Sequence, residues 1–518
     1  MEKILMKTLA FYLPQFHRIP ENDAWWGDGF TEWTAVRGAK PLFTGHEQPR
    51  EPLGGRYYDL LDKKTMAWQA SLAHEYGLDG FVFYHYWFRD GRKILERPAE
   101  NLLGWHDIDM PFCFDWANES WTRTWSRFQP SNVWSEDGKQ WRGRQRVLLQ
   151  QGYGDRSAWE QHFDYLLPFF LDHRYIKKDN RPVFLIYWPG DIGCLTEMKE
   201  CWDERAQKAG FDGVYLIGET KDAYQALYPP LDALLVRVPD YGLVRALPPT
   251  YIGGVATYDY ADCWHSSLWH DYPTETRVYY SGCLAYDTTP RRASNGVVLT
   301  GGSPDVFRNL LTELFQVSCD RGNEFAFLNA WNEWGEGAYL EPDERHEYGY
   351  LRALRDAKRQ IQTRRPDGTS QAAQLDLLRR SHRFYAMQLR ESLQMQDIFH
   401  YWLITELYGR NLTDALAERG WQTLAVYGYG LLGQYLVREI CKDSRLQLLG
   451  IVDRQADSLQ ADVSLYVDVN QLPAVDAIIV TPAVAGPDIK RQVQKVRQEM
   501  VCTLEEILRE LAQAIERS

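Results

Sequence analysis

Eight short apolar runs, separated by segments of helical composition, constrain the fold of this chain more than any other feature. In chain order they read ILMKTLAFYL, GFVFYHYW, PFCFDWAN, PVFLIYW, GVYLIGE, ALLVRV, TRVYYSG and FAFLNAW. Helical composition marks residues 63–77, 157–175, 197–210 and 304–322. Continuous apolar strands that alternate with helices are typical of a parallel sheet covered on both faces. Eight such repeats predict an α/β fold, a (β/α)8 TIM barrel with long loop insertions.

The chain has 518 residues, too many for one ordinary core, and its pattern changes after residue 362. The turn-rich break TRRPDGTS predicts that a barrel domain spans residues 1–362. Residues 363–421 are polar with apolar residues at helical spacing, which predicts a helical linker. From residue 422 the chain reads strand, glycine turn, helix and further strands, so we expect a small Rossmann-like α/β domain at 422–518.

The glycine turn of this last domain contains Gly428, Gly430 and Gly433, and Asp453 ends the next strand. Glycines for close backbone approach, a helix N-terminus and an acid for a ribose form the pattern of a dinucleotide site. A dinucleotide-binding fold is built from two similar halves, and this short unit shows no evident second half. Two interpretations therefore stay open, namely nucleotide or nucleotide-sugar binding and a structural or assembly module.

The net charge and the targeting signals restrict the kinds of partner and the location that we expect for this chain. The net charge of −13 argues against nucleic acid as a partner and against an anionic membrane surface. The N-terminus lacks the pattern of a secretory signal, and no apolar stretch reaches the length of a transmembrane segment. The eight cysteines are scattered, as in a reducing compartment. We expect a cytoplasmic protein, with peripheral membrane association left open. The 12 histidines show no HxH or HExxH spacing, so we expect no metal site.

Tryptophan is the unusual component. The chain has 20 tryptophans, and most of them lie between Trp25 and Trp334, within the predicted barrel. Tryptophan-rich clefts suit sugars, because an aromatic face attracts the polarised C–H bonds of a pyranose. The alternative is that these rings fill a large core. Composition therefore favours a carbohydrate-binding barrel without deciding which rings meet a ligand.

Polar and acidic residues follow nearly every predicted strand, at the end where barrel enzymes hold their active sites. Because the carboxyl ends of parallel strands share one edge, we expect these side chains to converge. They are Tyr12 and Gln15, then His85, Tyr86 and Trp87, then Asp115, Asn118 and Glu119, then Tyr187, Glu219, Tyr286 with Asp287, and Asn332 with Glu333.

The stretch FLNAWNEWGEGAYLEPD places Glu333 and Glu336 three residues apart, directly after the last strand. Gly335 and Gly337 allow a turn that directs both carboxyl groups into one cavity. Glycosidic chemistry needs such a pair, one group protonated and the other ionised. Crowding two acids raises the pKa of one of them. The alternative is an exposed acidic loop with caps and salt bridges.

Several motifs resemble a known family: FYLPQFHRIPENDAWWGDGFTEWTAV, GLDGFVFYHYWF, PFCFDWANESWTRTW, YDTTPRR and NAWNEWGEGAYLEPD. They are similar to WbsX-type proteins of bacterial surface-polysaccharide gene clusters, which share a domain with glycoside hydrolase family 99, the endo-α-mannosidases. The resemblance implies a barrel and a retaining mechanism through an E-W-x-E motif. Glu333 would be the base that activates the sugar's own 2-hydroxyl, and Glu336 the acid/base. Where the hydrolases carry a histidine, this chain has Gly335, which predicts a wider cleft.

The same resemblance implies which residues bind the sugar. Residues expected to contact sugar hydroxyls are Tyr12, His85, Tyr86, Asp115, Asn118, Glu119, Asp287 and Asn332. Expected stacking platforms are Trp87, Trp121 and Trp334, and Glu32 with Trp33 lies in a first loop that covers the cleft. Arg291 and Arg292 bind an anionic group or neutralise nearby acids.

The sequence leaves four candidate functions for this chain. The first is a glycosyltransferase or transglycosylase of O-antigen and lipopolysaccharide biosynthesis, acting on an oligosaccharide or polysaccharide and, as an open question, on a nucleotide sugar. The second is an endo-acting α-glycoside hydrolase, which would use the same residues. The third is a nucleotide-binding sensor or oxidoreductase in which the last domain binds the nucleotide. The fourth is a sugar-binding protein without catalysis. The barrel chemistry itself requires no cofactor.

Overall fold

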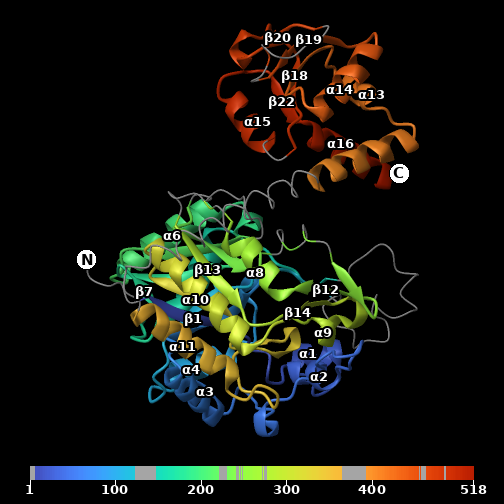
Figure 1. Cartoon of the computed structure of the whole chain (residues 1–518). Helices are drawn as coiled ribbons and strands as arrows, with labels where there is room; N and C mark the ends of the chain where they lie inside the picture. The colour runs from blue at the N-terminus through green and yellow to red at the C-terminus, as the bar shows by residue number, and fades with distance from the viewer. Residues whose placement is uncertain are drawn as a thin grey trace. The chain divides into compact units, whose positions relative to one another are not determined.

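The structure is a computed structural model (Figure 1). It describes residues 6–122, 147–220, 230–240, 244, 247, 249–270, 272, 277–363, 393–453, 456, 463–483 and 486–517. The chain forms two compact units, Met1–Arg379 and Arg380–Ser518, and each is described by itself.

Eight parallel strands close into a barrel in the first unit. Their order around the barrel is β1-β15-β13-β10-β9-β8-β4-β2, and β1 pairs with β2 to close it. Each of the eight predicted runs contains one of these strands, so the predicted (β/α)8 fold is confirmed. The strands are β1 (Lys7–Tyr12), β2 (Gly80–Trp87), β4 (Phe112–Trp116), β8 (Arg181–Ile186), β9 (Tyr215–Thr220), β10 (Ala233–Val238), β13 (Val278–Cys283) and β15 (Phe325–Asn329).

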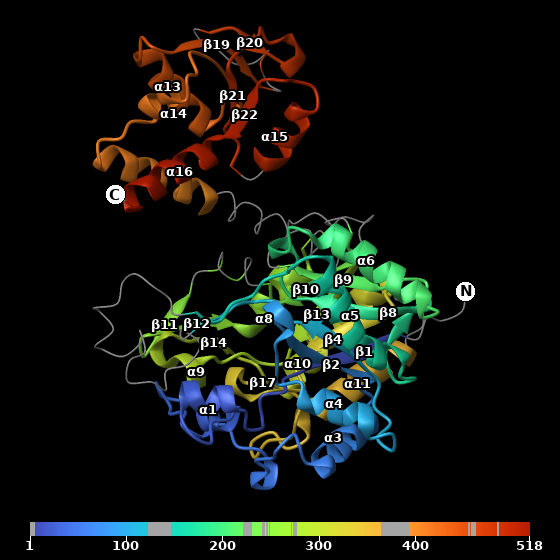
Figure 2. The same ribbon diagram turned by 180° about the vertical axis from the view of Figure 1, so that it is seen from behind.

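Helices surround the barrel, as the two views from opposite sides show (Figures 1 and 2). The helix α10 illustrates why they form: Ser303 caps its first turn by accepting a hydrogen bond from the Val306 N–H, and Phe307, Leu311 and Leu314 bury one face. The helices are α3 (Lys63–Glu75), α4 (Arg97–Gly104), α5 (Arg156–Leu171), α6 (Leu195–Lys208), α8 (Tyr260–Leu268), α10 (Pro304–Asp320) and α11 (Gly349–Thr363).

Insertions after the strands build one end of the barrel. Two of them, after β10 and after β13, together form a three-stranded sheet that was not predicted from the sequence, made of β11 (Thr250–Ile252), β12 (Val255–Asp259) and β14 (Val297–Thr300). It lies beside the short helix α9 (Thr289–Arg292) in both views (Figures 1 and 2). The first loop contributes α1 (Pro20–Trp26) and α2 (Glu32–Arg37), and the loop after β15 folds into β16 (Asn332–Glu333), the turn η7 (Trp334–Glu336) and β17 (Ala338–Tyr339).

The remaining short elements of the first unit connect these parts. They are η1 (Leu53–Gly55), η2 (Arg89–Gly91), β3 (Lys93–Ile94), β5 (Trp121–Thr122), β6 (Val147–Leu149), β7 (Lys177–Lys178), η5 (Pro189–Asp191) and η6 (Ala293–Asn295). Within the described ranges of the chain, no helix has both the length and the apolar character needed to cross a bilayer.

The second unit is a parallel α/β sheet in the strand order β20-β19-β18-β21-β22. Apolar clusters cover both of its faces. Its elements are α13 (Leu412–Glu418), β18 (Thr423–Tyr427), α14 (Leu431–Lys442), β19 (Gln447–Val452), β20 (Leu465–Tyr466), η9 (Val469–Gln471), β21 (Ala477–Val480), α15 (Gly486–Gln494), β22 (Met500–Thr503) and α16 (Leu504–Arg517).

The predicted linker, residues 363–421, is described only in part, because residues 364–392 lie outside the described ranges. A helix spans residues 393–407, and α13 follows it. Trp402 from this helix and Leu416 from α13 pack in one apolar cluster with Leu424 of β18. The described part of the predicted linker therefore contributes to the core of the second unit.

Candidate active site

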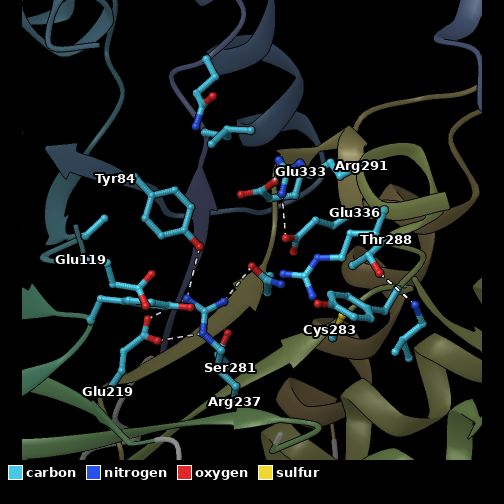
Figure 3. Close-up of a pocket in the computed structure, with 18 of the residues that line it drawn as sticks. Tyr84, Glu119, Glu219, Arg237, Ser281, Cys283, Thr288, Arg291, Glu333 and Glu336 are labelled. Atoms are coloured by element: carbon cyan, nitrogen blue, oxygen red, sulfur yellow. Dashed lines mark hydrogen bonds and ion pairs between the residues drawn. The ribbon is translucent and has the colours of Figure 1, made fainter. Parts of the chain in front are cut away.

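A cavity of about 870 Å³ lies at the carboxyl ends of the barrel strands. Its volume falls within the range of small-molecule sites, and its position is where barrel enzymes hold their chemistry. Two groups of charged side chains face it, one around Arg291 and one around Arg237 (Figure 3). Other lining residues include Tyr84, Tyr86, Glu119, Trp121, Tyr187, Ser281 and Tyr286.

Arg291 joins the predicted catalytic pair. Its Nη2 lies 2.9 Å from Glu333 Oε2, and its Nη1 lies 2.7 Å from Glu336 Oε1. Its Nε contacts a third carboxylate, Glu32 Oε1, at 2.6 Å. One guanidinium, from α9, therefore bridges three glutamates that come from two other segments of the chain, α2 and the loop after β15. Figure 3 shows Arg291 beside Glu333 and Glu336. From the sequence, we expected Arg291 either to bind an anionic group or to neutralise nearby acids. The structure places it beside three acids, which favours the second role. Arg292 lines the cavity.

Asp287 anchors α9 to the loop that carries Glu336. Its backbone N–H donates to the Glu336 carbonyl at 2.7 Å. Its buried carboxylate contacts His46 at 2.9 Å and accepts a hydrogen bond from Gln48 at 2.7 Å. Hydrogen bonds from His46, Thr289 and Gln48 and the charge of Arg50 lower the pKa of Asp287, although burial opposes them. Asp287, which we expected to bind sugar, holds the Arg291 turn against the loop and does not line the cavity.

The environment of Glu333 favours its protonated form. Its side chain is 8% exposed, and burial raises its pKa. The Arg291 charge lowers that pKa, while Glu336 and Glu32 raise it. Burial is the largest of these effects, and the net direction is upward. A proton held within a group of carboxylates is what paired-acid chemistry requires.

Gly335 leaves room for Glu32. A Cβ at this position would lie 1.9 Å from Glu32 Oε1 and 2.8 Å from Arg291 Nε, so any side chain would displace one or both. The prediction that Gly335 widens the cleft is wrong. The space beside this glycine is filled by a carboxylate and a guanidinium.

Arg237 forms the second charged group. Its Nε and Nη2 each lie 2.8 Å from an oxygen of Glu219, and its Nη1 donates to Asn329 at 3.1 Å. Burial lowers the pKa of Arg237, but the charge and hydrogen bonds of Glu219, together with Tyr84 and Tyr187, outweigh burial and hold that pKa well above the usual range. The guanidinium also lies over the rings of Phe11 and Tyr187, at 4.7 and 5.4 Å from their centroids.

Aromatic and acidic side chains form another wall of the cavity. Trp121 packs edge-on against Tyr86, with ring centroids 5.3 Å apart. Trp188 Nε1 donates to Glu119. The predicted sugar-binding residues that line the cavity are Glu32, Tyr86, Glu119 and Trp121, and the predicted catalytic pair lines it with them.

Glu341 anchors the loop from the inside. Its carboxylate accepts four hydrogen bonds, from Tyr58 (2.7 Å), Gln69 (2.7 Å), Trp331 (2.9 Å) and Trp334 (2.7 Å). Burial raises the pKa of Glu341 to about 7, although these hydrogen bonds oppose the shift. The two tryptophans flank Glu333 in the sequence, so Glu341 fixes the segment that presents the catalytic pair.

Three predicted sugar contacts point away from the cavity because side chains alternate along a strand. On β2, Tyr84 and Tyr86 face the barrel interior, whereas His85 and Trp87 face the helices. His85 contacts His162 of α5 at 2.8 Å, and Trp87 stacks on the same ring. Tyr12 of β1 likewise donates to Gln69 of α3 at 2.7 Å.

Five further predicted residues support the cavity walls and do not line the cavity. Asn332 accepts from the Leu13 N–H at 2.7 Å and thereby ties the loop to the end of β1. Asn118 bonds both the N–H and the carbonyl of Trp188. Trp33 and Trp334 pack on each other with centroids 5.5 Å apart, and Asp115 is fully buried in β4.

Sequence reasoning missed Tyr84, Arg237, Ser281 and Asn329, all of which line the cavity. A signal existed for them. Each lies on a barrel strand at the parity that faces the interior, as Tyr84 shows by accepting a hydrogen bond from Arg237 at 3.2 Å.

The glycines of the second unit shape a tight turn. Gly428 has φ +96°, and a Cβ on Gly433 would lie 2.1 Å from the Gly428 carbonyl oxygen. Gly430 caps α14, and a Cβ there would meet nothing within 4 Å. Asp453, expected at a ribose, accepts a hydrogen bond from the Tyr429 N–H at 2.8 Å. Its carboxylate therefore closes the turn from the neighbouring strand.

A parallel barrel with clustered carboxylates at the carboxyl ends of its strands is typical of carbohydrate-active enzymes. Comparison with known proteins agrees with this class. Residues 8–354 match the family described as Glycosyltransferase WbsX, and the chain belongs to this family.

Similar proteins are known from sequence and from structure. Two proteins described as "Uncharacterized protein WxcX", from Xanthomonas campestris pv. campestris strains B100 and ATCC 33913, are each 36% identical over 389 residues. The match covers 71% of this chain and 51% of the relatives, so the chain spans about half their length. Among solved structures, a glycoside hydrolase-like protein is 12% identical with a TM-score of 0.43, covering 68% of this chain and 93% of that one. The family 99 endo-alpha-mannosidase from Bacteroides thetaiotaomicron is 13% identical with a TM-score of 0.42, covering 69% and 97%. Both structural likenesses are too weak to add to what the chain's own strands establish.

Proposed function

We propose that this protein transfers glycosyl groups with retention of configuration during the assembly of a bacterial surface polysaccharide, with Glu333 and Glu336 as the catalytic pair. The observation that carries this proposal is the sharing of one guanidinium by both carboxylates, at 2.9 and 2.7 Å, inside a cavity at the carboxyl ends of the strands. Membership of the WbsX family supports the reaction class.

In the first step Glu333 takes the proton of the sugar's 2-hydroxyl, and that oxygen attacks the anomeric carbon. The bond to the departing oxygen breaks, and Glu336 gives this oxygen a proton. In the second step Glu336 takes the proton of an acceptor hydroxyl, which opens the 1,2-anhydro sugar at the anomeric carbon, and Glu333 returns its proton to the 2-oxygen. Two inversions give net retention.

The mechanism needs one proton on the pair, because the base is ionised while the acid is protonated. Burial raises the pKa of Glu333, so the proton favours Glu333 over Glu336 before the sugar binds. Sugar binding therefore has to move it toward Glu336. Arg291 contacts both carboxyl groups and stays paired with whichever one is ionised.

The presence of a general acid, Glu336, also indicates which kind of leaving group the donor carries. An alcohol oxygen departs slowly unless it receives a proton, whereas a diphosphate departs as a stable anion. Around the pair, three carboxylates face one guanidinium, which disfavours a diphosphate beside Glu336. We therefore propose a glycan donor, so that the reaction is a transglycosylation. Water in place of the acceptor would make the same chemistry an endo-acting hydrolysis.

For the second unit we propose a Rossmann-like fold with a structural or assembly role. Its strand order, numbered from β18, is that of a doubly wound sheet. The hydrogen bond from the Tyr429 N–H to Asp453 favours this role over a nucleotide, nucleotide-sugar or oxidoreductase site. Calorimetric titration of the full chain with NAD, UDP and GDP tests this, and micromolar binding to any of them would contradict it.

The test of the main proposal incubates the full-length protein with α-linked oligosaccharides, with and without nucleotide sugars, and follows anomeric protons by NMR. We expect elongated and shortened glycans of retained configuration without nucleotide sugar. Glu333→Gln and Glu336→Gln should each lower kcat by about 10²–10⁴-fold. Glu51→Gln, an exposed carboxylate outside the cavity, is the control. Full activity of both cavity variants, or strict dependence on a nucleotide sugar, would overturn the proposal.

A further inference from the structure

We propose that Glu32 is a third carboxylate of the catalytic cluster, a positioning residue that shares Arg291 with Glu333 and Glu336 and that reaches the site because residue 335 is glycine. This inference rests on the proposed role of the pair. It concerns residues from the first loop, from α9 and from the last barrel loop, which the fold brings together.

The geometry of Arg291 shows how Glu32 would position the pair. A guanidinium is planar, with its N–H donors in a fixed fork. Glu32 holds Nε at 2.6 Å, and this leaves Nη1 for Glu336 at 2.7 Å and Nη2 for Glu333 at 2.9 Å. Glu32 thus fixes the rotation of the fork, and the fork fixes both catalytic carboxyl groups.

The local sequence places Glu32 with little freedom. It is the first residue of α2, its backbone N–H donates to the Gln15 carbonyl at 3.2 Å, and its side chain is 6% exposed. Next to its carboxylate, position 335 lacks a side chain, and a Cβ there would come within 1.9 Å. Glycine at 335 and glutamate at 32 are therefore mutually dependent.

Charge gives Glu32 a second effect. The titratable and charged groups that face Glu333 are Arg291 from α9, Glu336 from its own loop, Glu32 from α2, and Tyr84 and Tyr86 from β2. Burial is the largest cause of the raised pKa of Glu333, and the charge of Arg291 opposes it. The additional negative charge of Glu32 raises the pKa of Glu333 and helps to retain one proton on the pair.

The first test is a double-mutant cycle between positions 32 and 335. We expect Gly335→Ala to lower kcat at least tenfold with a small change in KM, because its Cβ displaces the Glu32 carboxylate. In a Glu32→Ala background the same substitution should cost less than threefold, since the 1.9 Å overlap with the Glu32 carboxylate is gone and only the 2.8 Å contact with Arg291 Nε, which Glu32 no longer holds, is left. Equal losses in both backgrounds would overturn the dependence of one position on the other.

The second test needs no substrate. The full-length protein, labelled with carbon-13 at glutamate Cδ, is titrated by NMR, and the Glu333 signal is identified by its loss in Glu333→Gln. Glu32→Gln keeps an acceptor for Arg291 but removes the charge, so we expect the titration midpoint of Glu333 to fall by at least half a pH unit. Glu51→Gln should leave it unchanged. An unchanged midpoint in Glu32→Gln would contradict the proposal.

The two proposals fail in different ways. If Glu333→Gln and Glu336→Gln keep full activity, the catalytic role of the pair is wrong, whatever Glu32 does. If both lose activity while Glu32→Gln shifts neither the titration of Glu333 nor the pH–rate profile, only the role of Glu32 is wrong.

Discussion

Arg291 and Arg237 line the same cavity but balance charge in opposite ways (Figure 3). Arg237 faces one carboxylate, Glu219, through two parallel hydrogen bonds of 2.8 Å. Arg291 faces three carboxylates through one bond to each. The first group is locally neutral, and the second carries excess negative charge.

The difference separates a supporting pair from a reactive cluster. A bidentate pair satisfies both partners and has little reason to exchange protons. A guanidinium shared among three acids leaves negative charge that a proton can neutralise, so the cluster can release and accept that proton during a reaction. The cavity thus has one side, around Arg237, where charges balance, and another side, around Arg291, that is suited to acid–base chemistry.

Breaking the neutral pair should have the largest effect on stability. In Arg237→Met, the Glu219 carboxylate, whose side chain is 1% exposed, loses its cation. An unpaired buried charge of this kind lowers the free energy of unfolding by about 3–5 kcal/mol. Denaturant unfolding of the full chain at pH 7 measures it. The matched variant Arg237→Met with Glu219→Gln should recover most of the loss, and a loss below about 1 kcal/mol in the single variant would show that the pair is not a supporting element.

A smaller loss is expected from Glu341→Gln, which tests a carboxylate balanced by neutral donors. Glutamine offers one acceptor oxygen to four donors, so one or two buried N–H or O–H groups lose their partner, at about 1–3 kcal/mol. The pKa of Glu341 is raised from 4.5 to about 7, so the wild type loses stability as pH rises through this window. The variant lacks this group, and the difference between the two proteins should therefore shrink between pH 4.5 and 7. A difference that grows with pH would contradict the raised pKa.

The smallest loss of stability at low pH should come from Arg291→Met, despite the three bonds removed. Glu333, whose pKa burial already raises, can hold a proton, which limits the penalty. Without the cation the pKa of Glu333 rises further, and each unit corresponds to about 1.4 kcal/mol. A carboxyl group with a raised pKa loses stability as pH rises up to its folded pKa, and in the wild type burial raises the pKa of Glu333 to about 8. The two proteins should therefore lose stability alike below that pH, and this variant should fall further behind the wild type as pH increases from about 7 to 9. Unfolding curves across that range measure the trend, and a pH-independent loss would place Arg291 with Arg237 as a supporting residue.

Much of the fold was predictable from sequence because a barrel strand and its covering helices each carry their own pattern. All eight predicted runs contain barrel strands, and the helices from residues 63, 157, 197 and 304 form close to their predicted bounds. The β11–β12–β14 sheet was not predicted, since its strands are short and β11 is exposed along its whole length, which leaves no apolar signal.

The candidate site was only partly predictable for a related reason. Position at a strand end identified Tyr86 and Glu119, which line the cavity, but equally favoured His85 and Trp87, which face the helices. A strict reading of strand alternation would have replaced them with Tyr84. Arg237 and Asn329 obey the same alternation, within runs too apolar to attract attention as a site.

By itself the sequence determined the barrel and placed two glutamates at the mouth of its last strand, because strand period, helix period and residue order are local properties. Only the tertiary structure decided that Arg291, 259 residues from Glu32 in the chain, joins that glutamate to the pair across the space left by Gly335. Charge balance depends on distances of a few ångströms in space, and these are set by the packing of loops that carry no local signal of one another.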